Sequence, residues 1–282
     1  MAQRVESEAA FTGMGREFTE PPRSTVQHRV GMLSRLESIF RRTIDMPASK
    51  IFASCDDAVA DVFDGATVMI GGFGSFGGLP VHLIEALAKQ GAKELTIISN
   101  MGGRGFELTK LYKPGGYQDV GALYAKRQVK KFIGAVPALG GLPPTSPLEI
   151  QLREGGLDIE MVPIGTLVER IRAGAGGLGG FYTPTGVGTP VAKGKETKVI
   201  NGKEYLLELP LTADFALIKA HKADTLGSLV YRGTARCFNS VMAMAAKTTI
   251  VEVDHIVPAG ELDPEAVVTP HLYVSRVVEV AR

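Results

Sequence analysis

The sequence predicts an α/β fold built on a parallel sheet with flanking helices. Two short apolar runs, 67–70 and 95–99, are typical of buried strands. The segment 81–89 between them places its apolar residues on one helical face, and Gly91 follows as a C-cap. A strand, a helix and a strand in this order form a βαβ unit, whose two strands are parallel and whose crossover is right-handed.

The remaining elements extend this pattern. Pro80 suits the first turn of the helix over 81–89, because its missing N–H would be unbonded there anyway. Asn201-Gly202 lies between two apolar-rich runs and predicts a tight hairpin over 198–207. The glycine-rich tract 174–189 predicts a long functional loop or a linker. The other expected elements are helices at 55–63, within 102–111, from 150, at 167–172 with Thr166 as N-cap, and at 239–246; strands at 130–136, 158–162, 213–220, 247–253 and 272–280; an irregular loop at 137–149; and a turn or helix start at 263–265.

Composition excludes several classes of protein. The chain has 282 residues and a net charge of +1, so it lacks the concentrated basic excess of a nucleic-acid-binding surface. No apolar stretch approaches the ~20 residues that a membrane helix needs. Cys55 and Cys237 are far apart and make no metal-binding spacing, and the five histidines form no cluster with each other or with carboxylates. We therefore expect two free thiols in a reducing cytoplasm and no metal site.

Residues 1–45 differ from the rest of the chain. They mix arginine with glutamate and show no strand pattern. Their acidic residues are atypical of an organellar transit peptide. We expect a loosely ordered N-terminal extension, followed by one folded domain over 46–282.

A glycine-rich loop connects the first strand to the helix that follows it. Such a loop lets backbone N–H groups approach an anion or a polarised carbonyl, and a helix N-terminus adds partial positive charge. A loop that only lets the helix pack on the strand is the alternative. Asn100 ends the second strand, and ligands collect beyond the carboxyl ends of parallel strands. The candidate binding residues are Gly71, Gly72, Phe73, Gly74, Ser75, Phe76, Gly77, Gly78 and Asn100.

The spacing of Gly72, Gly74 and Gly77 also fits the G-x-G-x-x-G pattern of a dinucleotide-binding fold. An NAD-dependent oxidoreductase needs an acidic residue at the end of the second strand to hold the ribose. Ser99 and Asn100 stand there instead, which argues against this alternative.

From about Lys50 to Val280 the chain resembles the α subunit of the two-subunit 3-oxoacid CoA-transferases. The similar motifs occur in the same order as in that family. They are 64–73 with Gly77, Gly78 and Pro80; Ile97-Ile98-Ser99-Asn100; 165–174; 182–189; 194–196; Ala213-Asp214; 219–222; 234–236; Phe238-Asn239; and 260–264. The sequence departs from the family where Met101 replaces a frequent second Asn, where Ile164 replaces a frequent Gln, and where Pro80 comes one residue late.

The resemblance implies an open α/β sheet like that of some sugar-phosphate isomerases, and a partner, the β subunit, of similar fold. It implies transfer of CoA from an acyl-CoA such as succinyl-CoA to a 3-oxoacid, acetoacetate or 3-oxoadipate, with the CoA thioester as substrate and no permanently bound cofactor. A glutamate in a Glu-Asn-Gly motif of the β subunit forms the glutamyl-CoA intermediate. This chain contains no Glu-Asn-Gly, and we expect Glu154, Glu169, Glu208 and Glu261 to be solvated surface residues. The alternative is a non-catalytic CoA- or nucleotide-binding protein of the same fold.

Overall fold

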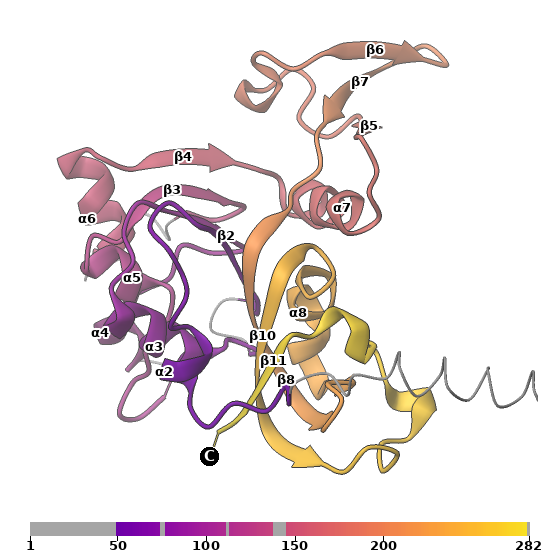
Figure 1. Ribbon diagram of the computed structural model, residues 1–282. Coiled ribbons are helices and arrows are strands. Elements are labelled where there is room, and N and C mark those ends of the chain that lie inside the picture. The colour runs from indigo at the N-terminus through magenta and orange to yellow at the C-terminus, as the bar shows by residue number, and fades with distance from the viewer. Residues whose placement is uncertain (1–48, 74–76, 111–112, 138–144, 281–282) are drawn as a thin grey trace, which may run out of the picture. The chain divides into compact units, whose positions relative to one another are not determined.

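The computed structural model describes residues 49–73, 77–110, 113–137 and 145–280 (Figure 1). The extension predicted for residues 1–45 lies outside these ranges. The eight-stranded main sheet has the order β11-β10-β8-β1-β2-β3-β4, with β9 attached to β8. Its strands are β1 (Thr67–Ile70), β2 (Leu95–Ser99), β3 (Val129–Gly134), β4 (Asp158–Met161), β8 (Ala213–Asp224), β9 (Leu229–Val230), β10 (Ala246–Val257) and β11 (Arg276–Glu279).

All neighbours along the main path are parallel, and the attached strand β9 pairs antiparallel with β8. The predicted fold class is therefore confirmed. The strands predicted at 67–70 and 95–99 have the observed bounds, and they pair with Ile70 opposite Ser99. The next residues along each strand, Gly71 and Asn100, thus leave the sheet at the same edge.

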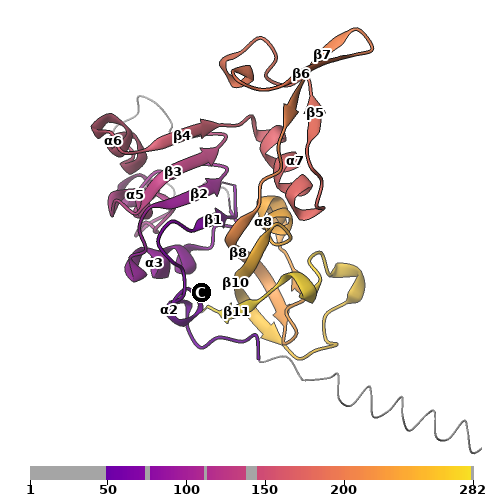
Figure 2. The same cartoon turned by 45° about the horizontal axis from the view of Figure 1, so that its top comes forward.

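Helices cover both faces of the main sheet (Figure 2). Successive residues of a strand point to opposite faces, so Val68 and Ile70 pack in one core and Met69 in another. The first core contains residues of α2, α3 and α5, and the second contains residues of α7 and α8. The helices are α2 (Cys55–Ala58), α3 (Val81–Gln90), α4 (Phe106–Thr109), α5 (Gly121–Ala125), α6 (Pro147–Glu154), α7 (Ile164–Ala175) and α8 (Cys237–Met242).

Several predicted bounds are wrong. Residues 147–149, predicted as loop, open α6: Ser146 and Glu149 form a capping box with Pro147 in the first turn. Thr166 is not an N-cap, because α7 begins at Ile164 after Pro163 and buries Thr166 in its first turn. Four further elements are shifted or shortened: α2 ends at Ala58, α8 covers Cys237–Met242, β3 ends at Gly134, and β11 begins only at Arg276, after a short 3-10 helix at His271–Tyr273.

A second, antiparallel sheet has the order β5-β7-β6 and lies beyond α7 in Figure 1. Its strands are β5 (Phe181–Thr183), β6 (Thr197–Ile200) and β7 (Lys203–Glu208), with a 3-10 helix at Pro190–Ala192. The glycine-rich tract 174–189 contains the end of α7 and all of β5, and it joins the helix to this sheet. Asn201 and Gly202 have φ values of 50° and 76°. Positive φ at both central residues is what a type I′ turn requires, so the predicted hairpin is confirmed.

This turn supplies a local test of the hairpin. Asn201→Val should lower the free energy of unfolding by about 1–2 kcal/mol, because a β-branched residue is poorly accommodated at positive φ. Asn201→Gly should be close to neutral. Thermal melts of both variants against the parent protein measure the difference, and equal melting temperatures for Val and Gly would contradict the assigned turn.

Candidate functional site

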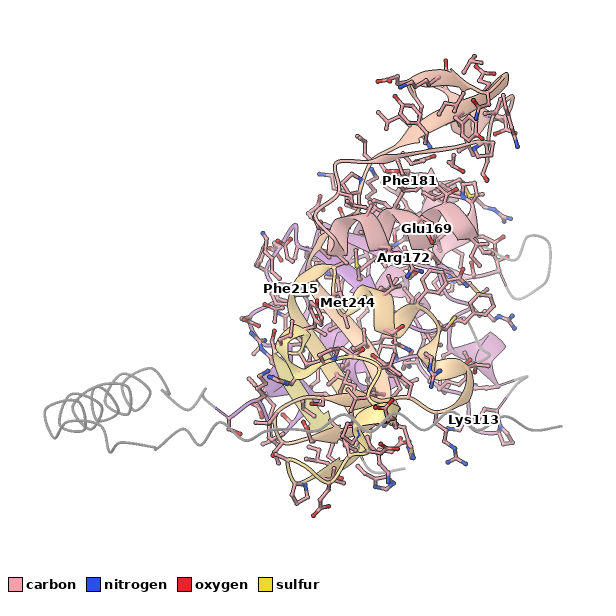
Figure 3. All side chains as sticks on the ribbon, turned by 90° about the vertical axis from the view of Figure 1, so that its right-hand side faces the viewer. Lys113, Glu169, Arg172, Phe181, Phe215 and Met244 are labelled. Carbon is pink, nitrogen blue, oxygen red and sulfur yellow. The ribbon has the colours of Figure 1, made fainter. Side chains whose placement is uncertain are left out.

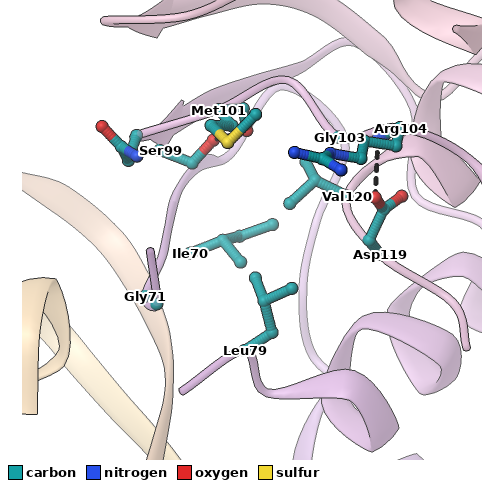
Figure 4. A pocket seen from close by; sticks show the side chains of 11 residues that line it. Ile70, Gly71, Leu79, Ser99, Met101, Gly103, Arg104, Asp119 and Val120 are labelled. Atoms are coloured by element: carbon teal, nitrogen blue, oxygen red, sulfur yellow. Dashed lines mark hydrogen bonds between the residues drawn. The ribbon is translucent and has the colours of Figure 1, made fainter. Parts of the chain in front are cut away.

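The first feature of the site is a small cavity between the ends of β1 and β2 (Figure 4). Its volume is about 10 Å³, which is close to the minimum for one water molecule. Asn100 lines it with 3% of its surface exposed, and its Oδ1 has no hydrogen-bond partner within the described structure. The lining residues are Ile70, Gly71, Gly72, Leu79, Ser99, Asn100, Met101, Gly103, Arg104, Asp119 and Val120. The cavity can accept one atom-sized polar group and is too small for a substrate chain.

A larger pocket, of about 500 Å³, is lined in part by Gly77 and Gly78, the limb of the glycine loop that leads back toward α3. This volume is within the range of small-molecule sites. His82, Lys113 and Lys219 bring basic groups to it, and Glu85 and Glu252 bring carboxylates. The other lining residues are Leu79, Val81, Phe106, Gly116, Tyr117 and Gln118. Sequence reasoning proposed only Gly77 and Gly78 among all of these.

The glycine loop closes on itself. The N–H of Phe73 donates to the carbonyl of Gly77 over 3.2 Å, and the Phe73 ring stacks on Phe238 of α8 with the ring centres 6.3 Å apart. Of the predicted binding residues, Gly71, Gly72 and Asn100 line the small cavity, and Gly77 and Gly78 line the larger pocket. The predicted binding residues Gly74, Ser75 and Phe76 lie outside the described residues.

The N-terminus of α3 already holds a carboxylate of the protein itself. Oε2 of Glu252, on β10, accepts from the N–H groups of His82 (2.9 Å) and Leu83 (3.0 Å). The expectation that this helix end offers positive charge to a ligand is therefore wrong for these two donors. No local pattern reveals the contact, because Glu252 lies about 170 residues away along the chain.

Glu252 also belongs to a row of charged side chains in the C-terminal halves of β8 and β10. Its Oε1 lies 3.6 Å from Nζ of Lys219, which in turn lies 2.9 Å from Oδ1 of Asp254. Nδ1 of His221 lies 2.9 Å from the other Asp254 oxygen. The pKa of His82 is raised, chiefly by its hydrogen bond to Glu252. Two carboxylates, one of them the buried Glu252, thus balance the Lys219 charge beside the larger pocket.

Of the four glutamates expected to be solvated, three form ion pairs within this chain. Glu154 and Glu169 are exposed and pair with Arg127 and Arg172; Figure 3 shows Glu169 and Arg172 together on α7. Glu261 is exposed as predicted. The prediction that Glu208 is a solvated surface residue is wrong. Its exposed fraction is 1%, and it forms ion pairs with Lys195 and Arg170.

The two cysteines are free thiols, as expected. Burial raises the pKa of Cys55 to about 12 and also raises the pKa of Cys237. The thiolate is the reactive form of cysteine, so neither residue is suited to nucleophilic attack at neutral pH.

The described residues hold no group of three or more His, Cys, Asp or Glu side chains arranged to bind a metal ion. Among the helices within those residues, none has both the length and the apolar character to cross a membrane.

Comparison with known proteins identifies the family. Residues 52–280 match the Coenzyme A transferase family model. The chain belongs to the Coenzyme A transferase family. It is 46% identical to the α subunit of the 3-oxoadipate CoA-transferase of Pseudomonas putida, over 83% of this chain and 94% of that protein. It is 43% identical to the α subunit of the succinyl-CoA:3-ketoacid coenzyme A transferase of Helicobacter pylori strain J99, over 81% and 91%.

The fold comparison agrees with this membership. An acyl-CoA transferase from Escherichia coli O157:H7, solved as a thioester complex with CoA, has a TM-score of 0.68 at 22% identity and matches 82% of this chain. This chain spans about half of that solved chain, 47%. The resemblance inferred from the sequence motifs is confirmed, and membership in this family opposes the NAD-dependent alternative.

Proposed function

We propose that this chain is the α subunit of a heteromeric 3-oxoacid CoA-transferase, over a domain of 46–282 preceded by an extension at 1–45. The proposal rests on one observation: the chain aligns with 94% of a known CoA-transferase α subunit at 46% identity. Its partner is a β subunit that carries the catalytic glutamate, since this chain contains no Glu-Asn-Gly sequence. The two free thiols fit a reducing compartment such as the cytoplasm.

The reaction proceeds by nucleophilic catalysis through a carboxylate. The partner's glutamate attacks the thioester of succinyl-CoA, giving a glutamyl-succinyl anhydride and CoA thiolate. The thiolate attacks the glutamyl carbonyl, releasing succinate and leaving glutamyl-CoA. A 3-oxoacid carboxylate then repeats both steps in reverse order, forming its own CoA thioester and freeing the glutamate.

This chain supplies binding and charge stabilisation in that scheme. The backbone of Gly71–Gly78 is proposed to contact the CoA thioester and the oxyanion formed on attack, and the larger pocket gives room for part of the ligand. Asn100 lines the small cavity, so its Nδ2 is proposed to donate to one small polar group such as the thioester oxygen. Removing one such donor costs on the order of 100-fold or more in rate. The acceptor is acetoacetate or 3-oxoadipate, in line with the 3-ketoacid and 3-oxoadipate transferases among the relatives.

Intact-mass analysis of the native complex tests this proposal. The complex is purified through a tag on this chain, treated with succinyl-CoA, and each of its chains is weighed. We expect a CoA-sized adduct on a co-purifying partner and none on this chain, with no adduct after treatment with free CoA. An adduct on this chain would refute the proposal that the catalytic glutamate lies on the partner subunit. A chain that binds CoA but brings down no partner able to form the adduct would instead support a non-catalytic binding protein.

A further inference from the structure

Asn239 is a fully buried polar residue on α8, with 0% of its surface exposed. Its side-chain amide makes three hydrogen bonds, all to backbone atoms. Nδ2 donates to the carbonyls of Gly78 (2.8 Å) and Ala235 (2.7 Å), and Oδ1 accepts from the N–H of Lys219 (3.0 Å). A buried amide with both donors and its acceptor engaged is held rigidly, because moving it would leave several buried groups unbonded.

The amide stands where the ladder between β1 and β8 ends. The last rung joins the N–H of Gly71 to the carbonyl of Leu217. If the parallel pairing continued, the next N–H along β8, that of Lys219, would bond to β1. It bonds to Asn239 instead. Oδ1 of Asn239 therefore takes the place of the backbone carbonyl that β1 would have offered to Lys219. The chain after β1 can then leave the sheet as the glycine loop.

The same amide fixes the point where the loop returns. Gly78 accepts its hydrogen bond, and a Cβ at Gly78 would lie 2.8 Å from Nδ2. A Cβ at Gly71 would lie only 1.8 Å from Oδ1. Both limbs of the loop thus close around Asn239, and the glycines at these two positions are required by this contact.

We propose that Asn239 is a positioning residue for CoA transfer, which holds the two limbs of the glycine loop and the backbone of Lys219 in one fixed arrangement. The inference rests on the proposed function. Gly78 and Lys219 both line the larger pocket, whereas Asn239 itself is enclosed and does not line it. The amide acts through the loop: it sets where the backbone donors lie when charge develops on the thioester oxygen.

Asn239→Asp tests the role of the amide with almost no change in shape. Oδ1 can still accept from Lys219, but the second carboxylate oxygen would face two carbonyl oxygens and repel them. A buried carboxyl in such surroundings has a raised pKa, and its protonated form can again donate one hydrogen bond. The hydrogen-bond partners of Asn239 are all backbone atoms, which have no titratable proton in this pH range. Asn201→Asp, on the exposed hairpin turn, is the matched control.

The measurement uses the complete complex with the partner, purified at low pH, where the new carboxyl is neutral. After a jump to pH 8, we expect kcat of Asn239→Asp to fall about 100-fold relative to the parent, the effect of a misplacement of about 1 Å. KM for succinyl-CoA should change little, because the loss concerns the transition state. The ratio of variant to parent kcat should rise again as the pH falls, and Asn201→Asp should follow the parent throughout.

Far-UV circular dichroism, recorded during the jump, separates positioning from folding. A drop in kcat while the spectrum is unchanged supports the proposal. A drop that follows only in step with loss of the spectrum, or a kcat within threefold of the parent at pH 8, overturns it. Failure of the proposed function has a different signature: the parent complex and Asn201→Asp would then also form no CoA adduct on the partner.

Discussion

Replacing Glu252 by alanine should lower the free energy of unfolding by about 3 kcal/mol. The substitution leaves the N–H groups of His82 and Leu83 without their acceptor, at about 1–3 kcal/mol for a buried group, and it removes one of the two carboxylates near Lys219. Glu252→Gln keeps an oxygen that can accept both hydrogen bonds and should cost about 1 kcal/mol, because only the charge is lost. Urea unfolding monitored by circular dichroism gives both values.

The titration of His82 gives a second readout for the same variant. Its pKa is raised above the ordinary value, chiefly by Glu252. A raised folded-state pKa stabilises the protein below the unfolded pKa, and this contribution is lost as the pH rises through the folded pKa. In Glu252→Ala the His82 pKa, followed by NMR, should move down toward the ordinary value and this part of the pH dependence should vanish.

The control for Glu252 is Glu261→Ala, which changes the same residue type at an exposed position. It should leave both the stability and the His82 titration unchanged. A loss of less than 1 kcal/mol in Glu252→Ala would show that the helix end does not depend on this carboxylate.

The parts of the fold that local sequence determines can be predicted. Strands β1 and β2 are short, mostly apolar and followed by glycine or asparagine, so their bounds are clear from the sequence. The hairpin follows from Asn201-Gly202, since few other pairs accept positive φ at both residues. The start of α6 also has a local signal: Ser146 and Glu149 have capping-box spacing, which the surrounding prolines and glycines obscure.

The far ends of β8 and β10 are harder to predict. The sequence pattern places the ends of these strands at 220 and 253, yet they pair as far as Asp224 and Val257. These extensions are rich in charged residues, which local patterns associate with loops. They remain strands because the two extensions pair with each other, and His221 contacts Asp254 across the pair over 2.9 Å.

The internal supports of the candidate site cannot be predicted from local sequence at all. Asn239 bonds to Gly78 of the glycine loop from 161 residues away, and Glu252 bonds to His82 in the first turn of α3 from 170 residues away. Their value lies in satisfying buried N–H and C=O groups that a loop leaves behind, and the sequence does not indicate which distant side chain will do so. The glycines themselves are visible in the sequence, but their reason is not: Gly71 is required by Asn239, whatever the loop binds.

That requirement leads to a stability prediction for Gly71→Ala. The new Cβ would be placed 1.8 Å from Oδ1 of Asn239, a contact that cannot exist without movement. Asn239 is fully buried and held by three hydrogen bonds, so the strain falls on the loop. We expect a loss of about 2–4 kcal/mol, in the upper part of the range for overpacking or above it. Gly165→Ala, where an added Cβ meets nothing within 4 Å, is the control; since Gly165 lies in the first turn of α7, alanine should leave the stability unchanged or raise it by up to about 1 kcal/mol.

A double-mutant cycle shows whether Asn239 is the cause. Asn239→Ala alone leaves the N–H of Lys219 and the carbonyl of Gly78 unbonded and should also be destabilising, by about 2–3 kcal/mol. In Gly71→Ala/Asn239→Ala the clashing oxygen is gone, so the two losses should not add. Because the residues are in direct contact, we expect a coupling energy of at least about 1 kcal/mol from the urea unfolding of the four proteins. Additive losses would place the strain elsewhere in the loop. Strong coupling would show that Gly71 and Asn239 form one structural unit, in which the effect of replacing one residue depends on the other.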